Sequence, residues 1–247
     1  MSTFLRKILQ PFFILYAVIL FLTGLVISCL LTFIIGLRNT HSSRLVSFGV
    51  LKCWSRVTLL LAGMPVKVTG KPNGGRYIVV ANHISYIDAA NLFSARPDYF
   101  HALGKIEMST IPLFGFLYRQ VVILVDRSST ESRSKSMLSM RHFLNESGNI
   151  FIFPEGTFNE TGQPLKEFYD GAFRLAISTQ TAILPLIFPD AKDRLPYKGW
   201  WTIWPGKNRA IYLDPVNVAG LTLDDVPKLK QQVYSLMEAA LVKHTSS

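Results

Sequence analysis

The feature that most limits the fold is a long stretch near the N-terminus without charge. From Ile8 to Leu37 no residue is charged, and Phe12 to Ile35 is almost entirely apolar. As a helix, this stretch is long enough to cross a hydrocarbon core of about 30 Å. A cleaved signal peptide fits less well, because the run exceeds the usual apolar length of about 7–15 residues and no small-residue cleavage site ends it. We therefore predict a helical, membrane-anchoring segment over residues 1–64.

The charge distribution indicates which surface this segment meets. Before Asp88 there is no acidic residue, whereas nine residues are basic: Arg6, Lys7, Arg38, Arg44, Lys52, Arg56, Lys67, Lys71 and Arg76. The other 160 residues are nearly balanced, so almost all of the net charge of +10 lies in the N-terminal third. A basic, acid-free and hydrophobic terminus favours an anionic bilayer over a nucleic acid. No basic module with exposed aromatic residues is evident, so we expect no nucleic-acid partner.

The orientation follows from the basic residues that flank the apolar run. Two precede it and four follow within about twenty residues, which by the positive-inside rule puts the C-terminal domain, and any active site in it, on the cytoplasmic face. Gly24 and Gly36 leave room for a break, so a helical hairpin that enters only one leaflet stays open. A second stretch, Leu45 to Gly63, repeats apolar residues at helical spacing. It fits a helix in the membrane interface or an amphipathic helix packed on the core equally well.

After Pro65 the pattern changes to short strands that alternate with helices. The expected strands are Val66–Thr69, Tyr77–Val80, Tyr99–Leu103, Val121–Val125, Asn149–Phe153, Ala182–Phe188 and Arg209–Leu213. The expected helices are Ser85–Ser94, Leu113–Tyr118, Thr130–Glu146, Gly171–Ser178 and Asp224–Val242. Such alternation is typical of βαβ units. We predict an α/β domain over residues 65–247, with a mostly parallel central sheet flanked by helices.

Polar residues follow four of the predicted strands where each ends. They are Asn82-His83, Gly104-Lys105, Asp126-Arg127 and Pro154-Glu155-Gly156-Thr157. The carboxyl ends of parallel strands meet at one edge of a sheet, and ligands bind there. The sequence therefore predicts a functional site at this edge.

His83 is the candidate general base, with Asp88 five residues later. The two side chains can meet only if His83 lies in a turn and Asp88 in the first turn of the next helix. Ser85-x-x-Asp88 has the form of a capping box, so Asp88 could also be only a helix cap. Ser85 is a poor nucleophile here, because a residue two positions from His83 points to the opposite side of an extended segment. One histidine and one aspartate also make a poor metal site, and the two cysteines show no zinc or disulfide pattern.

The segment Asn82-His83-Ile84-Ser85-Tyr86-Ile87-Asp88 resembles the N-H-x4-D signature of the glycerolipid acyltransferases. ALGKIEMSTIPLFGFLYR, VVILVDR, FIFPEGT and ILPLIF follow in the order of that family's other blocks. The similarity covers about Val66 to Asp214 and is specific, because several ordered blocks coincide. Within the family, the chain is most similar to the 1-acyl-sn-glycerol-3-phosphate acyltransferase branch.

The resemblance implies that His83 removes a proton from the acceptor's hydroxyl while Asp88 orients the imidazole. It implies direct acyl transfer from acyl-CoA or acyl-carrier protein to lysophosphatidate at the membrane, with no metal and no further cofactor. The residues that it implies for substrate binding are Asn82, Lys105, Arg127, Glu155, Gly156 and Thr157. Lys105 and Arg127 suit a phosphate, while Glu155 could accept a hydrogen bond from a substrate hydroxyl or orient Arg127.

Two positions depart from the family's pattern. Phe158 follows E-G-T where the family often has arginine, and Tyr169-Asp170 precede Gly171-Ala172 where it often has a basic residue. Both departures remove positive charge and bear on the acceptor. Another lyso-lipid, such as a lyso-aminolipid, and glycerol-3-phosphate are the alternative acceptors. A non-catalytic protein that binds anionic lipid is the alternative outside the enzymes.

Overall fold

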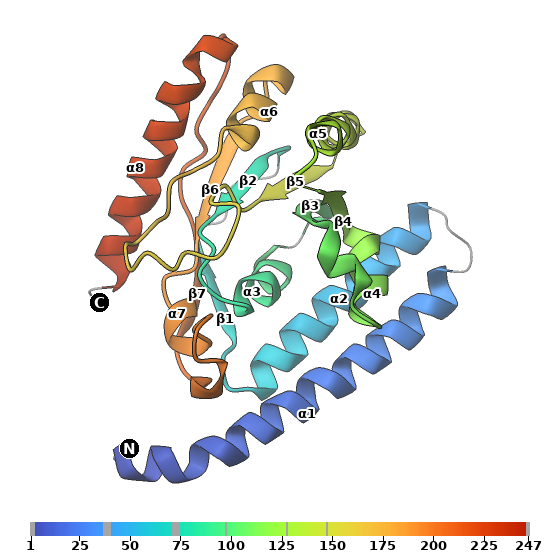
Figure 1. Ribbon diagram of the computed structural model, residues 1–247, viewed down its shortest axis with the longest axis vertical. Coiled ribbons are helices and arrows are strands. Elements are labelled where there is room, and N and C mark those ends of the chain that lie inside the picture. The colour runs from blue at the N-terminus through green and yellow to red at the C-terminus, as the bar shows by residue number, and fades with distance from the viewer. Residues whose placement is uncertain are drawn as a thin grey trace. The chain divides into compact units, whose positions relative to one another are not determined.

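The structure is a computed structural model that describes residues 3–36, 41–70, 75–96, 98–126, 128–146 and 148–245 (Figure 1). Arg38, Lys71 and Arg127 lie outside the described residues, as does most of the turn at Lys71–Gly75.

The chain forms two compact units. The first consists of Met1–Lys67, Ile84–Pro97 and Phe188–Ala210, and the second of Val68–His83, Asp98–Ile187 and Ile211–Ser247. His83 therefore ends a segment of the second unit, and Ile84 begins a segment of the first. The division into an anchoring segment over 1–64 and a catalytic domain over 65–247 stays a prediction.

The sheet has seven strands in the order β1-β7-β6-β2-β5-β3-β4. They are β1 Val66–Thr69, β2 Ile78–Ala81, β3 Phe100–Lys105, β4 Val122–Val125, β5 Asn149–Ile152, β6 Ile183–Ile187 and β7 Asn208–Tyr212. Each of these strands was expected from the sequence, with ends within two residues of those found. The predicted α/β fold with a mostly parallel sheet is confirmed.

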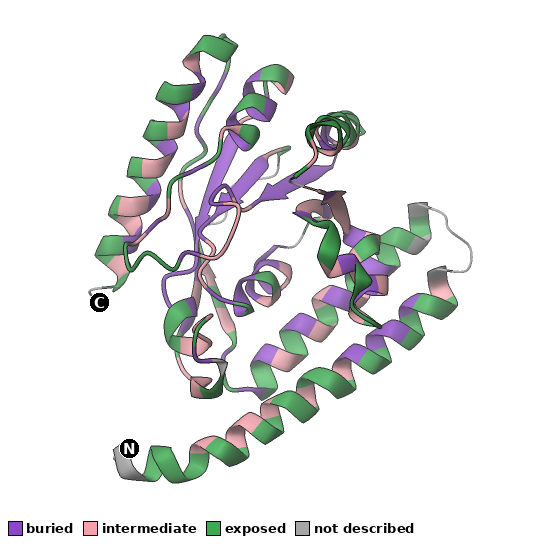
Figure 2. Ribbon diagram, viewed as in Figure 1, coloured by how far each residue is buried: buried purple, intermediate pink, exposed green. Residues whose placement is uncertain are grey.

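Strand direction brings the four expected ends to one edge. β2 runs parallel to β5 and β6, and β3 runs parallel to β4 and β5, whereas β7 is antiparallel to β6. All residues of β2 are fully buried (Figure 2), as expected for an Ile-Val-Val-Ala run in the middle of a parallel sheet. The order in the sheet differs from the order in the chain. β5 lies directly beside β2, and β3 and β4 lie beyond it.

Helices cover one face of the sheet in the second unit. α5 Thr130–Asn145 packs on β4 and β5, α6 Gly171–Thr179 on β2, and α8 Val226–Thr245 on β6 (Figure 1). α8 buries a stripe at a spacing of four residues, which is the pattern of a helix with one face on a core: Leu229, Val233, Met237 and Leu241. The shorter helix α4 Phe114–Val121 precedes β4.

The first unit contains α1 Thr3–Gly36, α2 His41–Leu61, α3 Ile87–Ala95 and α7 Ala191–Arg194. α1 packs along α2, where the absence of a side chain at Gly24 lets the Trp54 indole lie against the helix backbone. The Tyr16 hydroxyl donates to the Leu61 carbonyl at 3.1 Å, which fixes the two helices near the end of α2. α2 in turn packs on α3 through the Phe48 and Phe93 rings, with centroids 5.6 Å apart.

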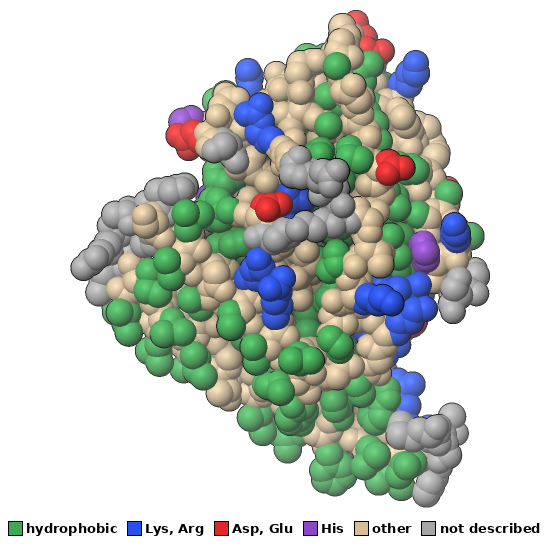
Figure 3. Space-filling model, turned by 180° about the vertical axis from the view of Figure 1, so that it is seen from behind, with side chains coloured by type: hydrophobic (Ala, Val, Ile, Leu, Met, Phe, Trp, Pro, Cys, Tyr) green, Lys and Arg blue, Asp and Glu red, His purple; other side chains and the backbone are tan. Residues whose placement is uncertain are grey.

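α1 keeps most of its apolar surface uncovered. Leu5–Ile35 is the one candidate membrane span among the described residues, and only 22% of its most apolar window is buried. Phe12, Leu15 and Ile34 are each at least 60% exposed. Hydrophobic side chains gather over α1 along the lower edge of Figure 3. A helix of this length and exposure suggests membrane association.

α2 is apolar on more than one side. The buried residues Phe48, Leu51, Ser55 and Leu59 form the stripe that packs inward. Other apolar residues of the same stretch lie off this stripe, since Val46, Val57 and Leu61 are exposed. α2 thus both packs on its unit, as one alternative expected, and exposes apolar residues, as the interfacial alternative expected.

Candidate active site

His83 lies two residues beyond the end of β2, and its backbone is held on both sides by the segment that follows β5. The His83 N–H donates to Glu155 Oε1 at 2.7 Å. The His83 carbonyl accepts from the Asn159 N–H, also at 2.7 Å. Because β5 is the direct neighbour of β2, the two polar segments leave the sheet side by side. The position of His83 is therefore set by main-chain hydrogen bonds.

Glu155 uses both of its carboxylate oxygens for this purpose. Oε2 accepts from the Lys166 N–H at 2.8 Å, while Oε1 holds His83, and the side chain is fully buried. Two backbone donors on the two oxygens fit an acceptor-only carboxylate. The geometry favours Glu155 as a residue that positions His83 and the loop, whereas the prediction that it binds substrate stays a prediction.

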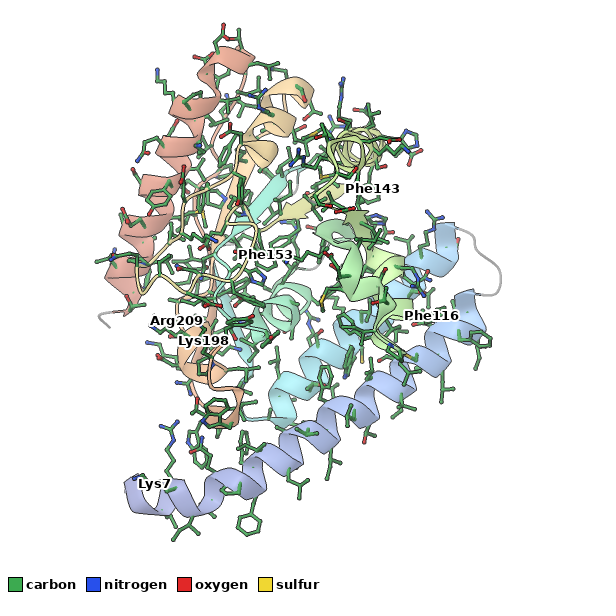
Figure 4. All side chains as sticks on the ribbon, in the orientation of Figure 1. Lys7, Phe116, Phe143, Phe153, Lys198 and Arg209 are labelled. Atoms are coloured by element: carbon green, nitrogen blue, oxygen red, sulfur yellow. The ribbon has the colours of Figure 1, made fainter. Side chains whose placement is uncertain are left out.

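The His83 ring lies between two phenylalanine rings. Phe153, labelled in Figure 4, stacks on it with a centroid distance of 3.8 Å and an interplanar angle of 12°. Phe158 covers it at 4.1 Å and 36°. The nitrogens of an imidazole make their hydrogen bonds in the ring plane, so stacking fixes the ring without using its nitrogens. The side chain is half-buried.

Asp88 belongs to the first unit, where it lies fully buried in the first turn of α3. Its Oδ2 accepts from the backbone N–H groups of Ile84 and Ser85, each at 2.8 Å. Half of the expected capping box is thus present. The other half differs, because Ser85 Oγ accepts from the Ile87 N–H rather than from Asp88, and it donates to the Leu195 carbonyl. The helix begins at Ile87, two residues later than expected, because Asp88 ties down the residues before it.

Residues 153–170 form a long loop that is stabilised by its own hydrogen bonds. Gly156 has φ of +73°, a conformation that favours glycine, and its N–H donates to the Phe153 carbonyl at 3.0 Å. Asn159 accepts from Thr161 and donates to the Gln163 carbonyl. The Lys166 ammonium donates to Thr157 Oγ1 at 2.7 Å. These hydrogen bonds give the loop a defined conformation beside His83.

The structure brings together one part of the predicted set. Asn82 and His83 after β2 lie beside the segment of Glu155, Gly156 and Thr157 after β5. Lys105 is exposed at the end of β3, two strands from β2, which corresponds to about 10 Å at a strand spacing of about 4.8 Å. Arg127, which follows β4, lies outside the described residues. Near it, hydrogen bonds from Ser128 lower the pKa of Asp126.

Sequence reasoning missed three contributors to this arrangement. Phe153 was visible only as the first letter of F-P-E-G-T, and Phe158 only as a departure from the family. Lys166 carried no signal, because its approach to Thr157 depends on how the loop folds back. No group of three or more histidine, cysteine or acidic side chains within the described ranges could hold a metal ion.

Comparison with known proteins identifies the family. A sequence profile described as Acyltransferase matches residues 65–189, which is half of the chain. This chain belongs to the acyltransferase family. The matched region contains His83, Asp88, Glu155 and the whole of the loop.

Several relatives of this acyltransferase carry one name. The 1-acyl-sn-glycerol-3-phosphate acyltransferase alpha of Mus musculus is 32% identical over 178 residues, covering 70% of this chain and 62% of the mouse protein. The 1-acyl-sn-glycerol-3-phosphate acyltransferase of Haemophilus influenzae is 30% identical over 170 residues, covering 68% of this chain and 69% of that protein. The match thus spans less than two thirds of the mouse protein.

A solved structure shares the fold. The crystal structure of the 1-acyl-sn-glycerophosphate acyltransferase PlsC from Thermotoga maritima superposes with a TM-score of 0.78. The superposition covers 98% of each chain, at 21% sequence identity. The N-terminal helices are thus included in the shared fold.

Proposed function

We propose that this acyltransferase is a membrane-bound 1-acyl-sn-glycerol-3-phosphate acyltransferase. It transfers a fatty acyl chain from acyl-CoA or acyl-carrier protein to the free hydroxyl of lysophosphatidate, and the product is phosphatidate. The main support for the proposal is the position of His83. It lies just beyond the central strand β2, and the segment after β5 that begins with F-P-E-G-T hydrogen-bonds to its backbone. The names of the relatives support the same acceptor.

In the proposed reaction, His83 accepts the proton of the acceptor's hydroxyl as that oxygen bonds to the thioester carbonyl carbon. The tetrahedral intermediate collapses, the C–S bond breaks, and the leaving thiolate takes the proton from the imidazolium. No acyl-enzyme forms. The rings of Phe153 and Phe158 hold the imidazole ring. The thioester has a good leaving group, so positioning of the two substrates supplies much of the catalysis.

Asp88 is proposed to orient the His83 imidazole, as the N-H-x4-D resemblance implies. Its carboxylate is itself held by two backbone N–H groups, so its orientation is fixed. Lys105, Arg127 and Thr157 are proposed to contact the acceptor phosphate, and Asn82 the substrate beside His83. The Gly156 N–H is engaged with Phe153 within the loop, so any contact of Gly156 with substrate has to come from elsewhere in its backbone.

α1 is proposed to bring the active site to substrates that reside in the bilayer. The exposed apolar residues of α1 and α2 contact lipid, and the basic N-terminal third favours a surface rich in anionic lipid. By the positive-inside rule, the active site faces the cytoplasm.

The test compares radiolabelled acyl transfer by purified wild-type protein and His83→Ala in lipid–detergent micelles. We expect the rate to fall about 10²–10⁴-fold, the contribution of a general base. His142→Ala is the matched control, since this histidine is exposed on α5 and pairs only with Glu146 in the part of the chain that is described. Equal rates for wild type and His83→Ala would overturn the mechanism.

Two further measurements separate the alternatives. Lysophosphatidate, glycerol-3-phosphate and a lyso-aminolipid are offered in the same assay, and the acceptor with the highest kcat/KM identifies the substrate. Asp88→Asn is expected to fold and to lose activity by orders of magnitude. If it unfolds while its folded fraction keeps full specific activity, Asp88 is only a helix cap.

A further inference from the structure

The loop after β5 holds one ammonium group close to the segment that fixes His83. Lys166 is the only lysine or arginine in residues 153–170. It is half-buried, and its Nζ donates to Thr157 Oγ1 at 2.7 Å. Its backbone N–H binds the same Glu155 carboxylate that holds His83. Within the described ranges, no ion pair joins this ammonium to a carboxylate.

The chemistry of the acceptor limits where its phosphate can lie. In 1-acyl-glycerol-3-phosphate, the carbon that bears the free hydroxyl is bonded directly to the carbon that bears the phosphate. A base that reaches the hydroxyl therefore has the phosphate within a few bonds of it. A cation on a segment near the base is therefore well placed to bind the phosphate.

The order of the strands determines which cation lies on the segment nearest to the base. Lys105 follows β3, which lies two strands from β2, or about 10 Å at a spacing of about 4.8 Å. Lys166 instead belongs to the loop of β5, the direct neighbour of β2. Two hydrogen bonds tie it to Glu155 and Thr157, within the segment that contacts His83.

We propose that Lys166 Nζ, with the hydroxyl of Thr157, adds a cation to the phosphate-monoester subsite for the acceptor, beside the contacts proposed above for Lys105 and Arg127. An ammonium has three N–H donors, of which one binds Thr157. The other two are directed to phosphate oxygens. The Thr157 oxygen accepts from Lys166 and so keeps its own O–H to donate to the same phosphate. This inference rests on the proposed function, because it names the group that recognises the proposed acceptor.

The test is a pair of charge-removing variants, Lys166→Gln and the control Lys135→Gln. Lys135 is exposed on α5 and pairs with Glu131, so the control removes the same charge away from the loop. With lysophosphatidate as acceptor, Lys166→Gln is expected to raise KM about 10- to 100-fold, the loss of one or two hydrogen bonds to a charged group. The KM for acyl-CoA and kcat stay within about threefold, and Lys166→Arg recovers most of the affinity.

A second acceptor distinguishes phosphate binding from support of the loop. 1-Acylglycerol lacks the phosphate, so its slow acylation is expected to be the same in wild type and Lys166→Gln. If the variant instead loses kcat equally with both acceptors, Lys166 only supports the loop around Glu155, and the inference is wrong. If the wild type is active and Lys166→Gln has the wild-type KM for lysophosphatidate, the inference about Lys166 is wrong while the proposed function stands. A wild type that acylates neither acceptor refutes the proposed function itself.

Discussion

Replacing Glu155 with glutamine separates a positioning residue from a substrate-binding one. In the wild type, each carboxylate oxygen accepts one backbone N–H, from His83 and from Lys166, and the side chain is fully buried. Glutamine keeps one acceptor oxygen and presents an amide NH₂ to the other donor. One of the two backbone N–H groups is then left facing a donor.

The size of the effect follows from these two contacts. The lost hydrogen bond to a charged group contributes about 1.5–3 kcal/mol, and an unsatisfied buried N–H costs about 1–3 kcal/mol. Removing a buried charge offsets part of this, so we expect Glu155→Gln to lower the free energy of unfolding by about 2–4 kcal/mol. At about 2–4 °C per kcal/mol for a chain of this size, Tm falls by about 5–15 °C.

The effect on catalysis is expected in kcat. A displacement of His83 by about 1 Å costs on the order of 10²-fold in rate. The assay measures acyl transfer from acyl-CoA to lysophosphatidate in micelles, well below the Tm of each variant, with Tm taken from intrinsic tryptophan fluorescence. We expect kcat to fall about 10²-fold while both KM values change less than about threefold. Glu167→Gln, an exposed glutamate in the same loop, is the control.

The opposite result would refute this reasoning. If Glu155 binds a substrate hydroxyl, Glu155→Gln raises the KM for lysophosphatidate and leaves Tm and kcat near those of the control. That pattern would show that the two backbone contacts do not determine the position of His83.

Two further predictions concern stability. The two oxygens of Asp190 accept hydrogen bonds from the guanidinium of Arg209, labelled in Figure 4, at 2.7 and 2.8 Å. We therefore expect Asp190→Asn to lower the free energy of unfolding, measured in urea, by about 2–4 kcal/mol. An unfolding midpoint equal to that of the exposed control Asp193→Asn would contradict this. The hydrogen bond from the Thr222 backbone N–H lowers the pKa of Asp225. The ionised carboxylate therefore stabilises the folded protein at pH values above the ordinary carboxyl pKa, and this stabilisation is lost as pH falls through the lowered pKa. In thermal melts, Asp225→Asn should be less stable than wild type at pH 7, with a gap that narrows below about pH 4; a gap independent of pH would refute the assignment.

The regular elements could be predicted because their signals are local. The run Ile78–Ala81 is apolar and β-branched, and the polar pair Asn82-His83 ends it, so the strand and its end follow from a few residues. The same holds for the stripe on α8. In α2 the local signal was ambiguous, because an apolar helix offers several stripes and only its packing partners select the one through Phe48.

The arrangement of the site depends on contacts between residues far apart in sequence. The chain gives the order β2, β3, β4, β5, but the sheet inserts β5 beside β2. This insertion puts Glu155 within hydrogen-bonding distance of His83, 72 residues earlier, and moves Lys105 two strands away. No periodicity in the sequence encodes that pairing. The family motifs named the right segments, but a motif does not show that both Glu155 oxygens bind backbone N–H groups.

The two departures from the family's pattern have structural partners. The Phe158 ring lies 4.1 Å from the imidazole of His83, centroid to centroid, so the residue after E-G-T packs against the proposed base. Asp170, just before α6, pairs with Lys230 of α8 at 2.8 Å and so ties the start of α6 to its neighbouring helix. The positive charge absent from position 158 is present eight residues later at Lys166, which the loop returns to Thr157. A less anionic acceptor is therefore not needed to explain either departure, and the acceptor screen with Lys166→Gln tests this relocation directly.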